Sequence, residues 1–439
     1  MKPLKSSLAT AFAGEAIVPG DKSISHRSLI MSSQAVGRSV VRGILKSEDV
    51  INTAKALRHM GVNIEEGEEE WYIDGVGVGG LSEPDSILDM GNSGTGVRLM
   101  MGLVGSYPFS TTFTGDESLR KRPMKRVITP LEEMGVDISA RDGGLLPLKV
   151  QGNDELLPIT YDLPVPSAQV KSAILLAGLN IAGETKVIER ENTRDHTELM
   201  MSYFGVEISV VESDEGRAIT ILGQPELKAK EINVPADPSS AAFVIVAAMI
   251  IPDSKIIIKD VCVNQSRVGL FEILKKMGGD IDCSNLRDEA GEKIADIHVA
   301  YSKLKGVVVP KEIAPSMIDE YPILAVAASF AEGATIMEGV GELRVKESDR
   351  LSAVENGLKK CGVECESTED SLTIFGNGDA PNGGGKIETF MDHRIAMSFL
   401  VMGMAAKNPV EVDDGEVINT SFPNFVGLMN NLGAKIQKL

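Results

Sequence analysis

Charged, hydroxyl and amide side chains are gathered at the starts of several small-residue, apolar segments. These starts occupy residues 20–27 (GDKSISHR), 91–98 (GNSGTGVR), 166–171 (PSAQVK), 319–320 (DE) and 392–394 (DHR). If each segment is a helix, its first turn offers free N–H groups and a partial positive charge, which favour anions. Lys22, Arg27 and Arg394 add full positive charges. Convergence of these groups in one cleft would make a site for an anionic small-molecule substrate.

Each of these features also has a purely structural interpretation. Ser and Asp at a helix start are usually N-caps. Residues 91–96 resemble a phosphate loop but lack the Lys-Ser/Thr ending of a P-loop and the Rossmann spacing. His26, His196 and His393 have no metal-like spacing, so structural hydrogen bonding is favoured over metal ligation. The basic run 120–126 is either a solvated loop or an anion contact.

A charged segment, residues 344–350 (RVKESDR), precedes another apolar helix. Its structural interpretation makes Ser348 the N-cap, with Asp349 favouring the helix dipole. Lys346, Glu347 and Arg350 are then left over as candidate site groups.

Composition excludes several classes of protein. The chain of 439 residues carries 63 acidic and 44 basic side chains, a formal charge of −19, and 43% of its residues are hydrophobic. These values are those of an ordinary globular protein, not a disordered or collagen-like one. The acidic charge argues against general nucleic-acid binding, and a 4% aromatic content is too low for a single-strand stacking platform.

Cysteine usage and hydropathy give no sign of secretion or membrane insertion. The four cysteines include no Cys-x-x-Cys pair, and Cys361 and Cys365 are interpreted as buried free thiols rather than metal ligands. No stretch reaches the roughly 18 apolar residues of a membrane span. Glu15 interrupts the weakly apolar N-terminal stretch, so no signal peptide is predicted. We expect a cytoplasmic protein.

A repeat runs along the whole chain. Six times an amphipathic helical stretch ends in a bulky apolar residue, then Gly, then an alternating β-like stretch; the glycines are Gly61, Gly135, Gly205, Gly278, Gly362 and Gly433. This pattern predicts a helix capped by Gly and followed by a strand. Before each lies a small-residue apolar helix, starting near Gly20, Gly91, Pro166, Ala236, Met317 and Met391. These second helices should be buried.

The repeat predicts six α/β units of about 70 residues, which are too many for one core. We expect two domains of three units each. The first comprises residues 20–234, and the second comprises residues 1–19 plus 235–439. The strand at the N-terminus could belong to either domain on the residues alone.

Six motifs in this order resemble the 5-enolpyruvylshikimate-3-phosphate synthases, or 3-phosphoshikimate 1-carboxyvinyltransferases. They are residues 20–27, 92–98, 122–123, 167–169, 344–350 and 392–394. The resemblance implies an α/β fold: a two-domain inside-out α/β barrel with three repeats per domain and the active site in the cleft between the domains. It also implies a transferase of the shikimate pathway to chorismate and aromatic amino acids, with no metal and no organic cofactor.

The implied reaction moves the enolpyruvyl group of phosphoenolpyruvate to the 5-hydroxyl of 3-phosphoshikimate and releases phosphate, by addition and elimination. Asp319 would take the hydroxyl proton, Glu347 would protonate the methylene carbon, and Lys22 would stabilise the leaving phosphate. The resemblance places Lys22, Ser23, Arg27, Ser167, Gln169, Asp319 and Lys346 on 3-phosphoshikimate, with Arg194 helping. It places Lys22, Gly94, Arg122, Gln169, Arg350 and Arg394 on phosphoenolpyruvate.

Three departures from many relatives bear on the phosphate contacts. Thr420 stands where they carry Lys, Ala168 where they carry Ser, and Glu342 where they carry Asn. They indicate a second branch of the family. The resemblance also makes the protein a glyphosate target, with binding weakened by the absence of Lys at position 420.

Two alternative functions are weighed. UDP-N-acetylglucosamine enolpyruvyl transferase usually has Asn after the first Lys and Cys before Arg-Pro, whereas this chain has Ser23 and no Cys before Cys262. A non-catalytic anion-binding scaffold would not favour two carboxylates, Asp319 and Glu347, near its anion. The expected partners are small anionic substrates, not nucleic acid or membrane, and we expect a monomer.

Overall fold

The computed structural model describes residues 2–214 and 216–439, which form two compact units. The N-terminal unit contains residues 20–234 with 289–292. The C-terminal unit contains residues 1–19, 235–288 and 293–439.

Each unit is built from two kinds of helix. The first kind is α1 (Lys22–Ser33), α3 (Gly94–Gly105) and α5 (Ala168–Gly178) in the N-terminal unit, and α7 (Pro238–Ile250), α10 (Tyr321–Ser329) and α12 (His393–Gly403) in the C-terminal unit. The second kind is α2 (Glu48–His59), α4 (Lys125–Met134), α6 (His196–Phe204), α8 (Gly269–Lys276), α11 (Arg350–Lys360) and α13 (Phe425–Asn431). A short helix, α9 (Ala314–Met317), precedes α10.

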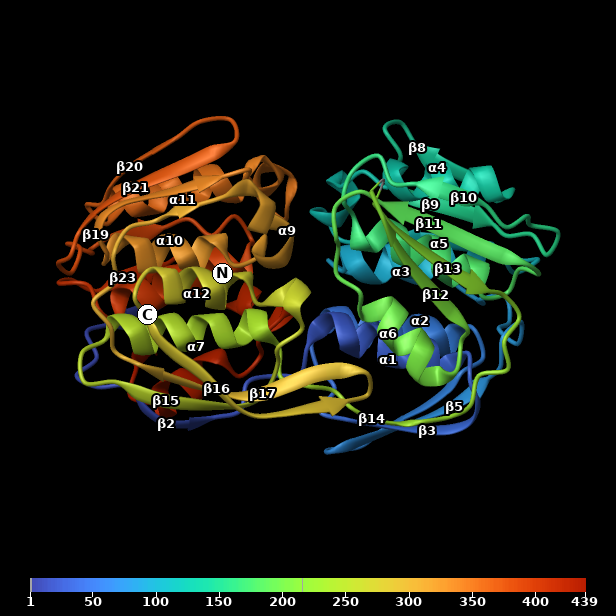
Figure 1. The fold of residues 1–439 in the computed structure, drawn as a ribbon, viewed down its shortest axis with the longest axis horizontal. Coiled ribbons are helices and arrows are strands. Elements are labelled where there is room, and N and C mark those ends of the chain that lie inside the picture. The colour runs from blue at the N-terminus through green and yellow to red at the C-terminus, as the bar shows by residue number, and fades with distance from the viewer. Residues whose placement is uncertain (1, 215) are drawn as a thin grey trace. The chain divides into compact units, whose positions relative to one another are not determined.

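The first kind of helix forms the core of each unit. Every residue of α7 and α10 is buried, because these helices are apolar on all sides. In the C-terminal unit α7, α10 and α12 pack against one another, and in the N-terminal unit α3 packs against α5 (Figure 1). Helices of the second kind bury one face only, as in α4, where Val127, Leu131 and Met134 are buried and Lys125 and Arg126 are exposed.

The described residues form six four-stranded sheets, three in each unit. Those of the N-terminal unit contain β14 (Glu231–Asn233), β3 (Val36–Arg42), β5 (Glu70–Val76) and β4 (Asn63–Glu66); β6 (Leu88–Asp89), β7 (Ser110–Thr114), β9 (Leu145–Gln151) and β8 (Asp137–Arg141); and β10 (Thr160–Asp162), β11 (Glu184–Glu189), β13 (Gly216–Leu222) and β12 (Ile208–Ser213).

Those of the C-terminal unit contain β2 (Ala13–Ala16), β15 (Lys255–Cys262), β17 (Glu292–Ala300) and β16 (Asp280–Glu289); β18 (Val308–Val309), β19 (Glu332–Glu338), β21 (Ser371–Asn377) and β20 (Glu364–Ser367); and β22 (Lys386–Ile387), β23 (Val410–Val412), β1 (Leu4–Ser7) and β24 (Lys435–Lys438).

One repeat shows the arrangement found in four of the six described repeats. Strand β6 pairs in parallel with β7, and the connection between them is the buried helix α3. Strands β7, β9 and β8 then pair antiparallel. A parallel pair needs a crossover connection, so these four repeats place the N-terminus of a buried helix just after the short edge strand. The helices α1 and α7 also begin after short edge strands, β2 and β14. These N-termini are the predicted anion-binding positions.

Three strands pair with strands that are far from them in the sequence. β2 precedes α1 in sequence but pairs with β15 of the C-terminal unit, and β14 precedes α7 but pairs with β3 of the N-terminal unit. The first strand, β1, pairs antiparallel with both β23 and β24. The alternative that the residues left open is thereby settled: the N-terminal strand completes a sheet of the C-terminal unit.

The glycine caps are confirmed. All six repeat glycines have a positive φ, between +75° and +116°, and each follows a helix of the second kind within two residues. The interpretation of Ser348 as an N-cap is wrong. Asp349 is the N-cap of α11, since its carboxylate accepts from the Ser352 N–H, while the Ser348 hydroxyl donates to Asp392.

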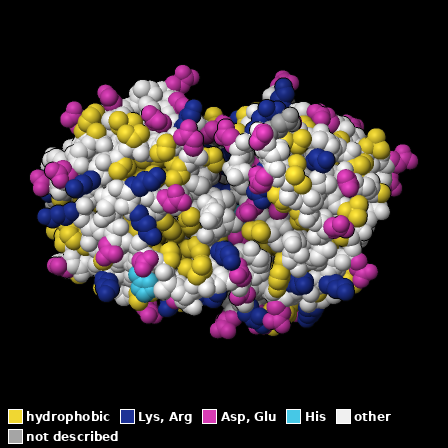
Figure 2. Space-filling view, in the orientation of Figure 1, with side chains coloured by type: hydrophobic (Ala, Val, Ile, Leu, Met, Phe, Trp, Pro, Cys, Tyr) yellow, Lys and Arg dark blue, Asp and Glu magenta, His cyan; other side chains and the backbone are white. Residues whose placement is uncertain are grey.

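Other expectations concern thiols, membranes and charge. Cys361 and Cys365 are buried free thiols, as predicted, and burial raises the pKa of each to about 11. In the part of the chain that the structure describes, no helix is both long enough and apolar enough to cross a membrane. Acidic and basic side chains are interspersed over the face shown in Figure 2.

Replacement of one cap glycine should reveal its backbone cost. Gly205 has φ +101°, and an added Cβ would meet no atom within 4 Å, so Gly205→Ala adds strain without a clash. We expect a loss of about 1 kcal/mol in the free energy of unfolding, measured by denaturant titration. Gly205→Asn should lose less, because Asn tolerates the left-handed region better. Equal stability of Ala and Gly at this position would contradict the cap assignment.

Candidate active site

Five of the six buried helices are N-capped by the short polar residues expected there, and α10 is the exception. Asp21, Ser93, Ser167, Asp237 and Asp392 each accept a backbone N–H of the following turn. The structural interpretation of these residues is therefore correct. It leaves the neighbouring cations and amides available for other bonds.

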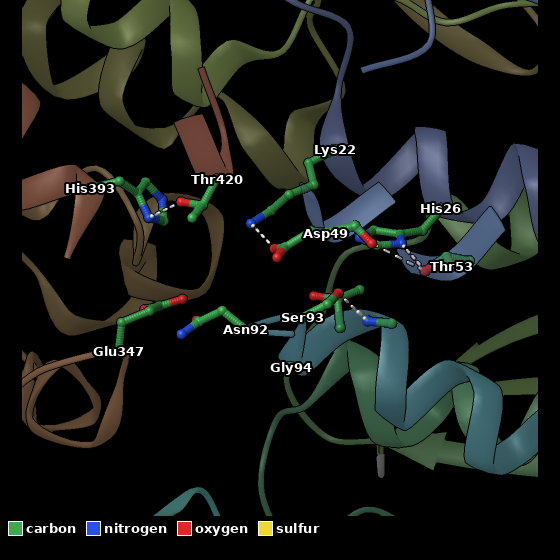
Figure 3. Close-up of polar contacts among 12 residues, drawn as sticks. Lys22, His26, Asp49, Thr53, Asn92, Ser93, Gly94, Glu347, His393 and Thr420 are labelled. Atoms are coloured by element: carbon green, nitrogen blue, oxygen red, sulfur yellow. Dashed lines mark hydrogen bonds and ion pairs between the residues drawn. The ribbon is translucent and has the colours of Figure 1, made fainter. Parts of the chain in front are cut away.

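Lys22 is the first residue of α1, and a carboxylate of α2 holds it in place. Its Nζ donates to Asp49 Oδ2 at 3.0 Å, as Figure 3 shows, and its side chain remains 21% exposed. Asp49 is nearly buried. Because Asp49 orients this ammonium group and part of the Lys22 side chain remains exposed to solvent, Lys22 can contact a phosphate.

Arg27 lies one turn further along α1 and is buried. Its guanidinium donates to Thr197 Oγ1 at 2.7 Å, to Ser172 Oγ at 2.9 Å and to the Ser23 carbonyl at 3.0 Å. Burial lowers its pKa to about 10, so it remains charged at neutral pH. These contacts bring Ser23 and Arg27, two of the predicted residues, together with the start of α5.

The loop before α3 positions a second arginine. Arg122 donates to Asn92 Oδ1 at 2.7 Å, and Asn92 donates to Asp116 Oδ2 at 2.7 Å. A Cβ added to Gly94 would lie 2.8 Å from the Arg122 guanidinium and 3.0 Å from that of Arg98. The glycine therefore gives these two cations their close approach to the start of α3.

The starts of α3 and α5 are joined through Gln169. Its Oε1 accepts from Arg98 at 3.0 Å, and its Nε2 donates to Thr95 Oγ1 at 2.9 Å. Ser167, two residues earlier, uses its hydroxyl to accept the Val170 N–H at 3.4 Å. Gly94, Arg122, Ser167 and Gln169 thus belong to neighbouring elements of the N-terminal unit, as Lys22, Ser23 and Arg27 do.

In the C-terminal unit the predicted acid and base meet on one arginine. Arg350, the first residue of α11, is 1% exposed, and its guanidinium donates to Asp319 Oδ1 at 3.2 Å and to Glu347 Oε2 at 2.5 Å. Its Nε donates to Asp392 Oδ2 at 2.8 Å. Burial alone would lower the pKa of Arg350, but Asp392, Glu347 and Asp319 raise it above its ordinary value. The charge of this arginine is permanent.

Arg394 and Thr420 also lie in the C-terminal unit. Arg394 donates to the Asp319 carbonyl at 3.2 Å and lies 3.6 Å from the Glu320 carboxylate. Thr420 Oγ1 lies 3.1 Å from His393 Nδ1, a contact drawn in Figure 3, and also donates to the Val417 carbonyl. Position 420 therefore carries a neutral hydroxyl beside the His393 imidazole.

Four further residues named from the sequence lie at the edges of other elements. Lys346 follows a short 3-10 turn, Gly341–Val345, and is half-buried, while Glu342 in that turn is exposed. Ala168 begins α5 and Arg194 lies just before α6; both are half-buried.

Two partners were missed from the sequence. Asp49 holds Lys22 across 27 residues, and no spacing signalled this contact. Asp392 was recognised as part of a motif but received no role. In the described chain no cluster of three His, Cys, Asp or Glu side chains could hold a metal ion. His26 and His196 hydrogen-bond to Thr53 and Glu292, the structural role that was favoured.

Comparison with known proteins first gives the class. The enolpyruvyl transferase NikO from Streptomyces tendae has the same fold, with a TM-score of 0.80 over 100% of this chain and 99% of that one. At 16% sequence identity this likeness establishes the fold alone. The structure thus has the fold of an enolpyruvyl transferase, and the predicted fold class is confirmed.

Closer matches give the family. The family model of EPSP synthase (3-phosphoshikimate 1-carboxyvinyltransferase) matches residues 8–429. A 3-phosphoshikimate 1-carboxyvinyltransferase from Paramagnetospirillum magneticum is 59% identical, with 99% of this chain and 98% of that protein covered. The structure of EPSP synthase from Acinetobacter baumannii has a TM-score of 0.89 at 44% identity, with both chains covered completely. The chain belongs to the EPSP synthase family, as its motifs predict.

Acid should destabilise the protein through His26. Burial, and then the charges of Lys22 and Arg27, lower its pKa from 6.5 to about 3, so the folded state keeps it neutral. The unfolded chain binds a proton below pH 6.5 and the folded one does not, so stability falls as the pH drops below that value, by about 1.4 kcal/mol per unit.

The variant His26→Asn removes this titration. Between pH 7 and pH 5 the parent should lose about 2 kcal/mol more unfolding free energy than the variant. Chemical denaturation at the two pH values measures the difference. Equal losses in the two proteins would show that His26 is not held neutral.

Proposed function

We propose that this protein transfers the enolpyruvyl group of phosphoenolpyruvate to the 5-hydroxyl of 3-phosphoshikimate and releases phosphate. This is the sixth step of the shikimate pathway to chorismate. The observation that carries the proposal is the pair of carboxylates, Asp319 and Glu347, held on one buried guanidinium in a chain that belongs to the EPSP synthase family. The reaction needs one group that takes the hydroxyl proton and one that gives a proton to the methylene carbon, and these two carboxyl groups can fill both roles.

The cations of the N-terminal unit suit the two anionic substrates. Lys22, Ser23, Arg27, Ser167 and Gln169 would bind 3-phosphoshikimate together with Lys346 and Asp319 of the C-terminal unit. Phosphoenolpyruvate would be bound by Lys22, Gly94 through its backbone, Arg122 and Gln169 together with Arg350 and Arg394. Arginine forks match carboxylates and phosphates through two parallel hydrogen bonds.

The addition step forms a C–O bond. The 5-hydroxyl oxygen attacks C2 of phosphoenolpyruvate, Asp319 accepts the hydroxyl proton, and Glu347 gives a proton to the methylene carbon, which becomes a methyl group. The C2 centre then carries both the new ether oxygen and the phosphate oxygen. Asp319 and Glu347 are 19% and 21% exposed, so each can reach a substrate from its place on Arg350.

The elimination step reverses the carbon protonation. Glu347, now a carboxylate, takes a proton back from the methyl group, and the bond from C2 to the phosphate oxygen breaks. The phosphate departs with its electron pair and takes up the proton held by Asp319. Lys22 and the arginines stabilise the charge that develops on the phosphate.

The proposed binding residues come from both units of the chain. Enclosure of the reacting atoms would keep water from attacking the cationic C2 carbon. We also propose that the protein acts in the cytoplasm, as a monomer and without metal or organic cofactor.

The identity of the acceptor can be tested directly. The purified chain is incubated with phosphoenolpyruvate and either 3-phosphoshikimate or UDP-N-acetylglucosamine, and released phosphate is measured. We expect release with 3-phosphoshikimate only. Release with the nucleotide sugar would favour the sister transferase, and absence of release with both would favour a non-catalytic anion-binding protein.

The role of Asp319 gives a second test. Asp319→Asn retains the shape and can still accept a hydrogen bond from Arg350, but it cannot take a proton. We expect kcat to fall at least about 100-fold while the dissociation constant of 3-phosphoshikimate changes little. Steady-state kinetics and calorimetric binding measure the two quantities. Near-parent turnover would exclude Asp319 as the base.

A further inference from the structure

One carboxylate of the Arg350 cluster differs from the other two. Asp392 is fully buried, whereas Asp319 and Glu347 are partly exposed. Its Oδ2 accepts from Arg350 Nε at 2.8 Å and from Ser348 Oγ at 3.0 Å, and its Oδ1 accepts the Arg394 N–H at 2.9 Å. Asp392 is thus fixed by groups from two different segments of the C-terminal unit.

The position of Asp392 on the guanidinium matters. It occupies the edge formed by Nε and Nη2, because Oδ1 also accepts from Nη2 at 3.5 Å. Nη1 then faces Asp319, and Nη2 is shared between Asp392 and Glu347. Because a guanidinium is planar and rigid, fixing its Nε edge fixes the directions of both terminal nitrogens. A neutral anchor at that edge would let the plane rotate within the cluster.

The turn that carries Asp392 is strained. Phe390 and Met391 have φ values of +52° and +58°, in the left-handed region that bulky side chains rarely adopt, and both are more than half exposed. Thr389 secures the turn by donating from its N–H and its hydroxyl to Asp413. Such strain persists where the surrounding structure requires a defined geometry, and it is concentrated at functional sites.

We propose that Asp392 is a positioning residue, which orients Arg350 so that Asp319 and Glu347 are presented together at the correct spacing for proton transfer. It does so without touching the substrate. This inference rests on the proposed function and extends it to a residue outside the predicted set. The alternative is that Asp392 is merely the N-cap of α12.

The variant Asp392→Asn separates these roles. Asn caps helices as well as Asp does, so the cap of α12 is retained. Its amide nitrogen cannot accept from Arg350 Nε or Ser348, and one negative charge is lost. We expect kcat for phosphate release to fall about 10- to 100-fold, with an unchanged dissociation constant for 3-phosphoshikimate.

Asp349→Asn is the matched control. Asp349 is also a helix N-cap paired with an arginine, Arg344, but that arginine bonds neither Asp319 nor Glu347 in the described contacts. We expect near-parent kcat in this variant. If Asp392→Asn does not fold, Ser348→Ala replaces it, because it removes one bond to Asp392 and should lower kcat a few-fold.

A double variant distinguishes positioning from general damage. If Asp392 acts through the carboxylates, then Asp392→Asn combined with Asp319→Asn should lose much less activity than the product of the two single losses. A kcat in Asp392→Asn equal to that of the parent would overturn the inference, and so would multiplicative losses. Failure of the parent chain to release phosphate would instead overturn the proposed function.

Discussion

A single buried guanidinium, that of Arg350, holds the proposed proton-transfer groups of the C-terminal unit together. Three carboxylates from three separate segments converge on it, although removing charges from water is costly. The cost is offset because every carboxylate is aimed at an N–H group and one of them is fixed by further donors. Three carboxyl groups around one guanidinium are more than the neutralisation of its charge requires. The arrangement holds two proton-transfer groups close together.

In the N-terminal unit the predicted site residues are mainly cations, whereas carboxylates surround Arg350 in the C-terminal unit. Its repeats place the starts of α1, α3 and α5 together with Lys22, Arg122 and Arg27. Neighbouring side chains orient these cations, because Asp49 accepts from Lys22, Asn92 from Arg122 and Thr197 from Arg27. The buried His26 stays neutral beside them, since burial and the neighbouring cations disfavour its protonation. The repeats explain the clustering of helix starts, because α3 and α5 are crossover helices that each begin just after the short edge strand of their own sheet.

Much of this was predictable because it depends on local periodicity. The six Gly caps, the six buried helices and the α/β fold class follow from apolar spacing and from the left-handed turn that Gly allows. Contacts between distant segments were not predictable. The pair of Lys22 with Asp49, the N-cap at Asp349 instead of Ser348, and the anchoring of Arg350 by Asp392 depend on tertiary packing, for which the sequence carries no periodic signal. The roles assigned to the substrate-binding residues remain predictions.

The central claim is that Glu347 protonates a carbon atom and then the proton is removed again. Turnover in D₂O tests it most directly, because a transient methyl group rotates and mixes its hydrogen atoms. We expect deuterium in the vinyl methylene group of the product, detected by mass spectrometry and NMR, and its loss in Glu347→Gln. A product formed at a normal rate without carbon-bound deuterium would contradict the addition–elimination mechanism.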